Sequence, residues 1–94
     1  MADKVEVLNV NQPGHVGRVD AAKYNAMKSA MLSTVTAAPL TAAQIKAGVL
    51  PQLPDDVFPG GSTAGWWLKC VQLDLEARGI LQRHPTKPLT WSLA

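Results

Sequence analysis

The stretch from Ser62 to Lys87 contains the polar side chains that are best suited to contact an anionic polymer. Lys69, Gln72 and Glu76 follow one another at three- and four-residue spacing, so on a helix they form one polar stripe. On such a stripe a lysine can contact guanine or phosphate, and a glutamine can contact adenine. The stripe is equally consistent with an ordinary solvated helix face. The candidate DNA-contacting residues are Ser62, Thr63, Lys69, Gln72, Arg83 and Lys87.

The candidates that flank the stripe are suited to phosphate. Ser62 and Thr63 precede the expected helix, where hydroxyls and free main-chain amides can bind an anion. Arg83 and Lys87 follow it and add positive charge in an expected hairpin. The stripe itself contains no arginine, although arginine is the commonest base-specific donor.

A second, apolar stripe that includes Trp66 and Leu73 allows a different function. If the helix is central, both side chains belong to the core, which is the favoured interpretation. If they are exposed, they mark a protein-interaction surface, because tryptophan is enriched at interface hot spots. Asp74 lies between this stripe and a broader apolar face formed by Trp67, Leu68, Val71 and Leu75, so an unpaired carboxylate there would be costly. We expect it to pair with Arg78, one helical turn further on.

Residue types that support catalysis or metal binding occur singly or far apart. Cys70 is the only cysteine, and neither His15 nor His84 has acidic or thiol neighbours at ligand spacing. The segment 59–63 contains two glycines but lacks the lysine of a phosphate-binding loop. Cys70, on a largely apolar helix, is expected to be an inert buried thiol. We therefore expect no catalytic site, no cofactor and no metal, and an enzyme is the least favoured class.

Capping and turn residues divide the chain into elements that position these side chains. Asp20 is a favoured N-cap, and Thr41 with Gln44 matches a capping box. Gly79 is suited to the left-handed position that ends a helix. Between these capping and turn residues, the spacing of apolar residues indicates which segments are helices and which are strands. The expected elements are a hairpin over 5–19, helices over 21–33 and 42–50, an ordered loop over 51–61, a helix from Ser62 or Thr63 to Arg78, and a hairpin over 80–93.

Composition limits the class of protein further. The 94 residues suffice for one domain, which we place over residues 1–94. The net charge of +2 is a weak basic bias, so it neither indicates nor excludes nucleic acid. No apolar run approaches the length of a membrane span, and the N-terminus resembles neither a signal nor a transit peptide. We expect a soluble cytoplasmic protein that does not bind membranes.

The C-terminal third carries a recognisable pattern. It reads Leu73-x-Leu75-x3-Gly79-Ile80-Leu81-x-Arg83, followed by Lys87-Pro88-Leu89-x-Trp91. This pattern resembles the passage from recognition helix to wing in bacterial winged-helix proteins. The whole chain, with its LNVNQPG, PDDVFPGG and GWW segments, also resembles an uncharacterised family of short bacterial proteins, which implies no activity.

The winged-helix resemblance implies a mainly helical α+β fold of the winged helix-turn-helix type. It would have an N-terminal β-hairpin, three helices and a C-terminal β-hairpin wing. The function it implies is that of a DNA-binding protein, such as a transcriptional regulator, with double-stranded DNA as partner. The alternative is a protein–protein interaction module that binds a protein partner or forms a homodimer, through Trp66 and Leu73 or through the edge of the N-terminal hairpin.

Overall fold

Local capping interactions begin the first two helices of the computed structural model, which describes residues 3–94. The Asp20 carboxylate accepts a hydrogen bond from the Lys23 main-chain amide at 3.2 Å and begins α1 (Ala21–Thr34). Thr41 and Gln44 form a reciprocal capping box at the start of α2 (Ala42–Val49). Both predicted caps are confirmed. Residues 1 and 2 of the predicted domain lie outside the described part.

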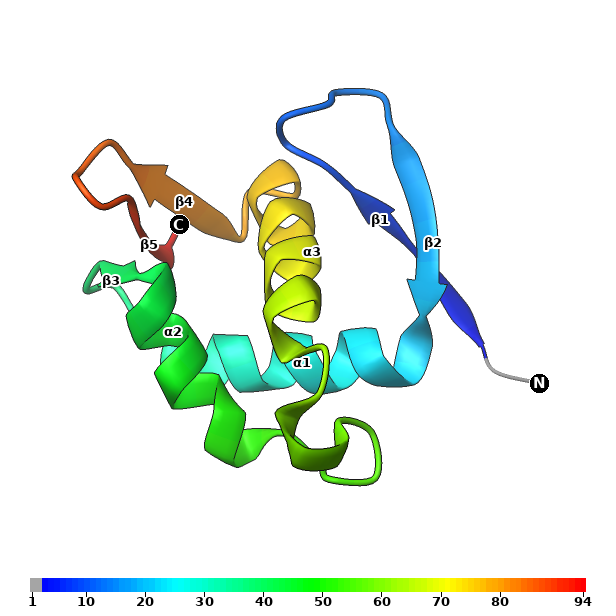
Figure 1. Cartoon of the computed structure of the whole chain (residues 1–94). Coiled ribbons are helices and arrows are strands. Elements are labelled where there is room, and N and C mark those ends of the chain that lie inside the picture. The colour runs from blue at the N-terminus through cyan, green and yellow to red at the C-terminus, as the bar shows by residue number, and fades with distance from the viewer. Residues whose placement is uncertain (1–2) are drawn as a thin grey trace.

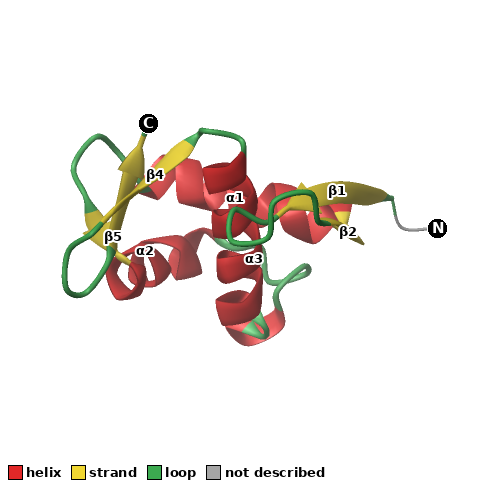
Figure 2. Ribbon diagram, turned by 90° about the horizontal axis from the view of Figure 1, so that it is seen from above, coloured by secondary structure: helices red, strands yellow, loops and turns green. Residues whose placement is uncertain are grey.

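Two small antiparallel sheets flank the three helices, so the fold is α+β (Figure 1, Figure 2). The N-terminal hairpin pairs β1 (Lys4–Leu8) with β2 (Val16–Asp20). The C-terminal hairpin pairs β4 (Leu81–His84) with β5 (Thr90–Leu93). β5 also pairs with β3 (Leu40–Thr41), a strand that sequence analysis missed because two residues are too few to show alternation.

The third helix and the loop before it differ from expectation at their junction. α3 spans Ala64–Ala77, and Gly79 follows it with the expected positive φ of 75°. Thr63, one of the two predicted caps, occupies the N-cap position, but its backbone is left-handed, with φ of 61°, and its side chain makes no capping hydrogen bond. The loop contains two short 3-10 helices, η1 (Leu50–Gln52) and η2 (Pro59–Gly61). Its Phe58 is buried edge-on against Trp67, with ring centroids 6.4 Å apart, and this contact holds the loop to the core.

α3 lies at the centre of the molecule, with a hairpin on each side (Figure 1). It packs against α1, β1 and β4, and its inner face joins a single core. Because three neighbours bury most of its circumference, only a narrow part of α3 remains at the surface. Its buried residues are Ala64, Trp67, Leu68, Val71, Gln72, Asp74 and Leu75.

The described helices are all too short or too polar to cross a membrane. Residues 3–94 likewise contain no group of three or more His, Cys, Asp or Glu side chains placed to hold a metal ion.

Candidate functional site

The exposed strip of α3 separates two surface grooves. Gly65, Trp66 and Lys69 are its exposed residues near the N-terminal end, opposite the side chains that enter the core. On one side lies a groove of about 370 Å³ between α2, α3 and the C-terminal hairpin, which we call the basic groove. On the other side lies a groove of about 490 Å³ between α3 and the N-terminal hairpin, which we call the apolar groove. Gly65 and Lys69 line both.

The basic groove gathers cations from three elements. Lys46 of α2, Lys69 of α3 and Arg83 of β4 line it, and none of its lining residues is acidic. Lys46 crosses towards α3: its Nζ lies 3.6 Å from the point that a Cβ on Gly65 would occupy. Lys46 was not among the residues predicted from sequence to contact DNA. The fold instead places it in the same groove as Lys69.

The carboxylate of Glu76, on α3, neutralises part of this positive charge through Arg83. It accepts two hydrogen bonds from Arg83, at 2.9 Å from Nε and 3.0 Å from Nη2. It also accepts a bond of 2.9 Å from the indole N–H of Trp91. The sequence predicted that Glu76 lies on a solvated polar stripe, but its side chain is only 4% exposed. Arg83 is thereby held with its guanidinium 5.7 Å from the centre of the Trp91 ring.

Gln72 also differs from expectation, because it is 4% exposed rather than on the outer face. It lines the floor of the basic groove, and its side-chain amide makes no hydrogen bond within residues 3–94. No fully buried side-chain nitrogen or oxygen in that range lacks a partner, so the amide retains some contact with the groove. At that depth it is placed to contact a group that enters the groove and not one that passes over it.

The remaining DNA candidates are exposed but lie outside both groove linings. Ser62 and Thr63 precede α3, and the Thr63 hydroxyl donates to the Ser62 carbonyl at 2.6 Å. Lys87 lies in the turn between β4 and β5. The structure therefore brings Lys69, Gln72 and Arg83 together in the basic groove, and the other three candidates lie outside it.

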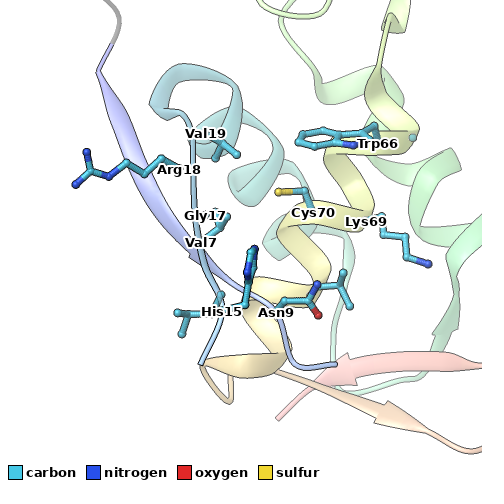
Figure 3. Close-up of a pocket in the computed structure, with 12 residues that line it drawn as sticks. Val7, Asn9, His15, Gly17, Arg18, Val19, Trp66, Lys69 and Cys70 are labelled. Carbon is cyan, nitrogen blue, oxygen red and sulfur yellow. The ribbon is translucent and has the colours of Figure 1, made fainter. Parts of the chain in front are cut away.

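The apolar groove exposes the residues that sequence analysis favoured as core. Trp66 is 60% exposed, and its ring meets Trp67 edge-on with centroids 5.0 Å apart. Leu73 is half-buried along the same wall. Cys70 lies between them in sequence and is also half-buried, and desolvation raises the pKa of its thiol, which keeps it protonated. Figure 3 shows Trp66 and Cys70 facing the N-terminal hairpin across this groove.

A buried carboxylate fixes the hairpin that forms the opposite wall. Asp74 is fully buried and accepts from Arg78 Nε at 2.9 Å, the pairing predicted from sequence. It also accepts from the Leu8 main-chain amide at 2.8 Å and from the Tyr24 hydroxyl. Arg78 Nη2 in turn donates to the Glu6 carbonyl at 3.1 Å. This network joins β1 and α1 to α3, so the apolar groove is held open by tertiary contacts.

Sequence reasoning missed the residues that reach these grooves from other elements. Lys46, Asn11 and His15 are separated from α3 by 18 or more positions, and no spacing rule links them to it. The one signal available from the sequence was Lys46 in the last turn of α2. A model of how the predicted helices pack could have placed this side chain near α3.

Comparison with known proteins places the chain in a family without assigning it an activity. The chain belongs to the family of unknown function DUF6958, whose model matches residues 4–91. Searches of curated proteins and of solved structures returned no significant match.

Proposed function

We propose that this member of the family is a cytoplasmic winged-helix protein that binds double-stranded DNA through α3 and the C-terminal hairpin, without catalysis. The observation that carries the proposal is the convergence of Lys46, Lys69 and Arg83 on one groove without an acidic lining residue. Phosphate contacts from lysine and arginine supply most of the sequence-independent affinity for DNA. α3 would present Lys69 to the duplex.

The order of elements supports the winged-helix assignment. After the N-terminal hairpin, the chain runs through α1, β3, α2, α3, β4 and β5, and β5 lies between β3 and β4 in the sheet. In a winged helix the hairpin after the third helix is the wing, and it lies beside the recognition helix. Here Arg83 is on the wing and Lys87 is in its turn, both on the chain segment that would follow the duplex backbone.

The positions around α3 suit phosphate contacts more than base reading. Lys69 is the exposed charged side chain near the N-terminal end of α3, and Gln72 is too deep to reach past it. Ser62 and Thr63 are exposed at the N-terminal end of the helix, where main-chain amides favour an anion. We therefore propose binding that depends mainly on the phosphate backbone, with a strong dependence on salt.

The test is fluorescence anisotropy of a labelled random-sequence duplex, titrated with protein over a salt series. Lys46→Ala and Lys69→Ala are each expected to weaken binding and to reduce the salt slope by about one, the effect of a lost phosphate contact. Lys4→Ala is the matched control, because Lys4 is exposed on β1 and lines neither groove. Wild-type protein that fails to bind at low salt would contradict the proposal. Equal losses in all three variants would contradict the proposed orientation.

The exposure of Trp66 favours one second candidate, a protein-interaction module that uses Trp66 and Leu73. Large exposed aromatic side chains are typical anchors of protein interfaces. Sedimentation of the wild type and of Trp66→Ala tests its homodimer form. A wild-type dimer that the substitution converts to monomer would favour this function over DNA binding.

A further inference from the structure

The apolar groove is hollow because the strand opposite α3 lacks one side chain. Val7 and Gly17 are paired across the N-terminal hairpin, on the face that is turned towards α3. Val19, two residues further along β2, lies on the same face. A Cβ on Gly17 would meet Val7 Cγ2 at 3.4 Å and His15 Nε2 at 4.0 Å, which are ordinary contacts. Neither packing nor a positive φ therefore requires glycine here, although glycine weakens a strand.

The groove has an apolar end and a polar end (Figure 3). Trp66 and Val19 enclose the first, with Cys70 beside them, and Figure 3 shows all three near one another. Asn9 and His15 lie at the other end, where the hairpin turns. Within residues 3–94 the His15 ring makes no hydrogen bond or ion pair, so it is available to a ligand.

The charges around the groove favour an anion. None of its lining residues is acidic, whereas Lys69 and Arg18 are both among them. Figure 3 shows the Arg18 and Lys69 side chains both directed away from the space between α3 and the hairpin. Lys69 is exposed on the strip of α3 that separates the two grooves, so its flexible side chain can turn back towards an anion bound beside the His15 ring. The nearby Asp74 carboxylate is fully buried and occupied by Tyr24, Arg78 and the Leu8 amide, so it does not oppose an anion in the groove.

We propose that the groove between the N-terminal hairpin and α3 binds a small amphipathic anion, with its apolar body against Trp66 and Val19 and its anionic group towards His15 and Lys69. The volume of about 490 Å³ is within the range of small-molecule sites, and the lining is mainly apolar with few polar groups, as in such sites. The Asp74 network holds both walls in place before a ligand arrives, which lowers the entropic cost of binding. The apolar groove is distinct from the groove proposed to bind DNA, and the two share Gly65 and Lys69.

Isothermal titration calorimetry with decanoate, kept below its micelle concentration, tests the site, and decanol is the neutral probe of equal length. We expect decanoate to bind roughly fivefold more tightly than decanol, the effect of a charge-assisted contact at a partly exposed site. Gly17→Val fills the hollow on the α3-facing side and is expected to weaken decanoate binding by about tenfold or more. Because valine is favoured in strands, the melting temperature of the Gly17→Val variant should be equal to or above that of the wild type.

Two further variants make the result decisive. Val16→Thr is the matched control, because Val16 is adjacent to Gly17 but projects from the opposite face and is 50% exposed. It should bind decanoate as the wild type does. Trp66→Ala removes an exposed side chain, so it should weaken binding without unfolding the protein, and it serves as the test if Gly17→Val fails to fold.

Three outcomes would overturn the proposal. Undiminished binding to folded Gly17→Val or to Trp66→Ala would show that the ligand lies elsewhere. Equal affinity for decanoate and decanol would remove the anionic class. A wild-type dimer in sedimentation that Gly17→Val dissociates would show that a second copy of the chain occupies the groove.

Discussion

At the residue scale, the main determinant of the structure around α3 is a single carboxylate. Asp74 is fully buried and joins three elements through Leu8, Tyr24 and Arg78. A buried ionised group must have partners, because desolvation of an unpaired charge is costly. The sequence placed Asp74 between apolar stripes and so predicted a partner. It did not indicate that β1 and α1 would supply two of them.

Removal of this carboxylate should separate the N-terminal hairpin from α3. Asp74→Ala leaves the Leu8 amide and the Tyr24 hydroxyl without an acceptor, so we expect a loss of about 3 kcal/mol in unfolding free energy. The Arg78 side chain is 39% exposed, and its ion pair accounts for little of that loss. Urea denaturation of the wild type and of Asp74→Ala measures this loss of unfolding free energy. The control Asp56→Ala alters an exposed loop carboxylate and should change stability by less than about 0.5 kcal/mol.

The tyrosine in this network should make stability depend on alkaline pH. Burial, followed by the hydrogen bond to Asp74, raises the pKa of Tyr24 above its ordinary value. A raised folded-state pKa stabilises the protein fully below the ordinary phenol pKa of about 10 and loses that contribution as pH rises beyond it. The unfolding free energy of the wild type should therefore fall more steeply above that pH than that of Tyr24→Phe. If the unfolding free energies of the two proteins change in parallel with pH, Tyr24 ionises as readily in the folded state as in the unfolded state.

At the element scale, the crossing of α1 and α2 depends on a glycine. A Cβ on Gly48 would clash with Thr34 Cγ2. Thr34 cannot move away freely, because its hydroxyl donates to the Ala30 carbonyl at 2.8 Å and accepts from Gln52 Nε2 at 2.9 Å. The close approach of these two helices sets where α2, and with it Lys46, lies beside α3.

Gly48→Ala should therefore destabilise the protein, by about 1–3 kcal/mol, although alanine is the better helix former. The double variant Thr34→Ser with Gly48→Ala removes the clashing methyl group and keeps the hydroxyl, so it should recover most of the loss. Thermal unfolding of the two single variants and the double variant measures this coupling. Additive effects of the two substitutions would contradict a direct contact.

At the scale of the whole molecule, the balance of charge on the basic groove is set by Glu76. This carboxylate, contributed by α3, binds Arg83 and Trp91 of the C-terminal hairpin and so joins helix and wing. It also lowers the local positive potential that DNA binding would use. Stability and electrostatic attraction are therefore opposed at this position.

Glu76→Gln should separate the two effects. The amide oxygen can still accept from Trp91, but the charge that holds Arg83 is lost, so we expect about 1–2 kcal/mol lower stability. If the basic groove binds DNA, affinity at low salt should rise roughly threefold, because one negative charge is removed beside it. Glu6→Gln makes the same charge change on the exposed part of β1 and is the control in the anisotropy assay. A rise in both variants, or in neither, would place DNA binding on another surface.

The sequence by itself determined what depends on neighbours along the chain. The caps at Asp20 and Thr41, the helix end at Gly79 and the pairing of Asp74 with Arg78 all involve groups within four residues of one another. Such interactions form from local geometry, which the spacing of residue types fully specifies. The α+β class and the order of three helices between two hairpins follow from them.

Only the tertiary structure decided which sides of α3 are exposed. Helical spacing gives the angles between side chains but not the direction of the core, which depends on where α1 and the two hairpins pack. That packing buried Gln72, left Trp66 at the surface and placed Lys46 in the same groove as Lys69. The two grooves lie between elements far apart in the sequence, so no local pattern could reveal either of them.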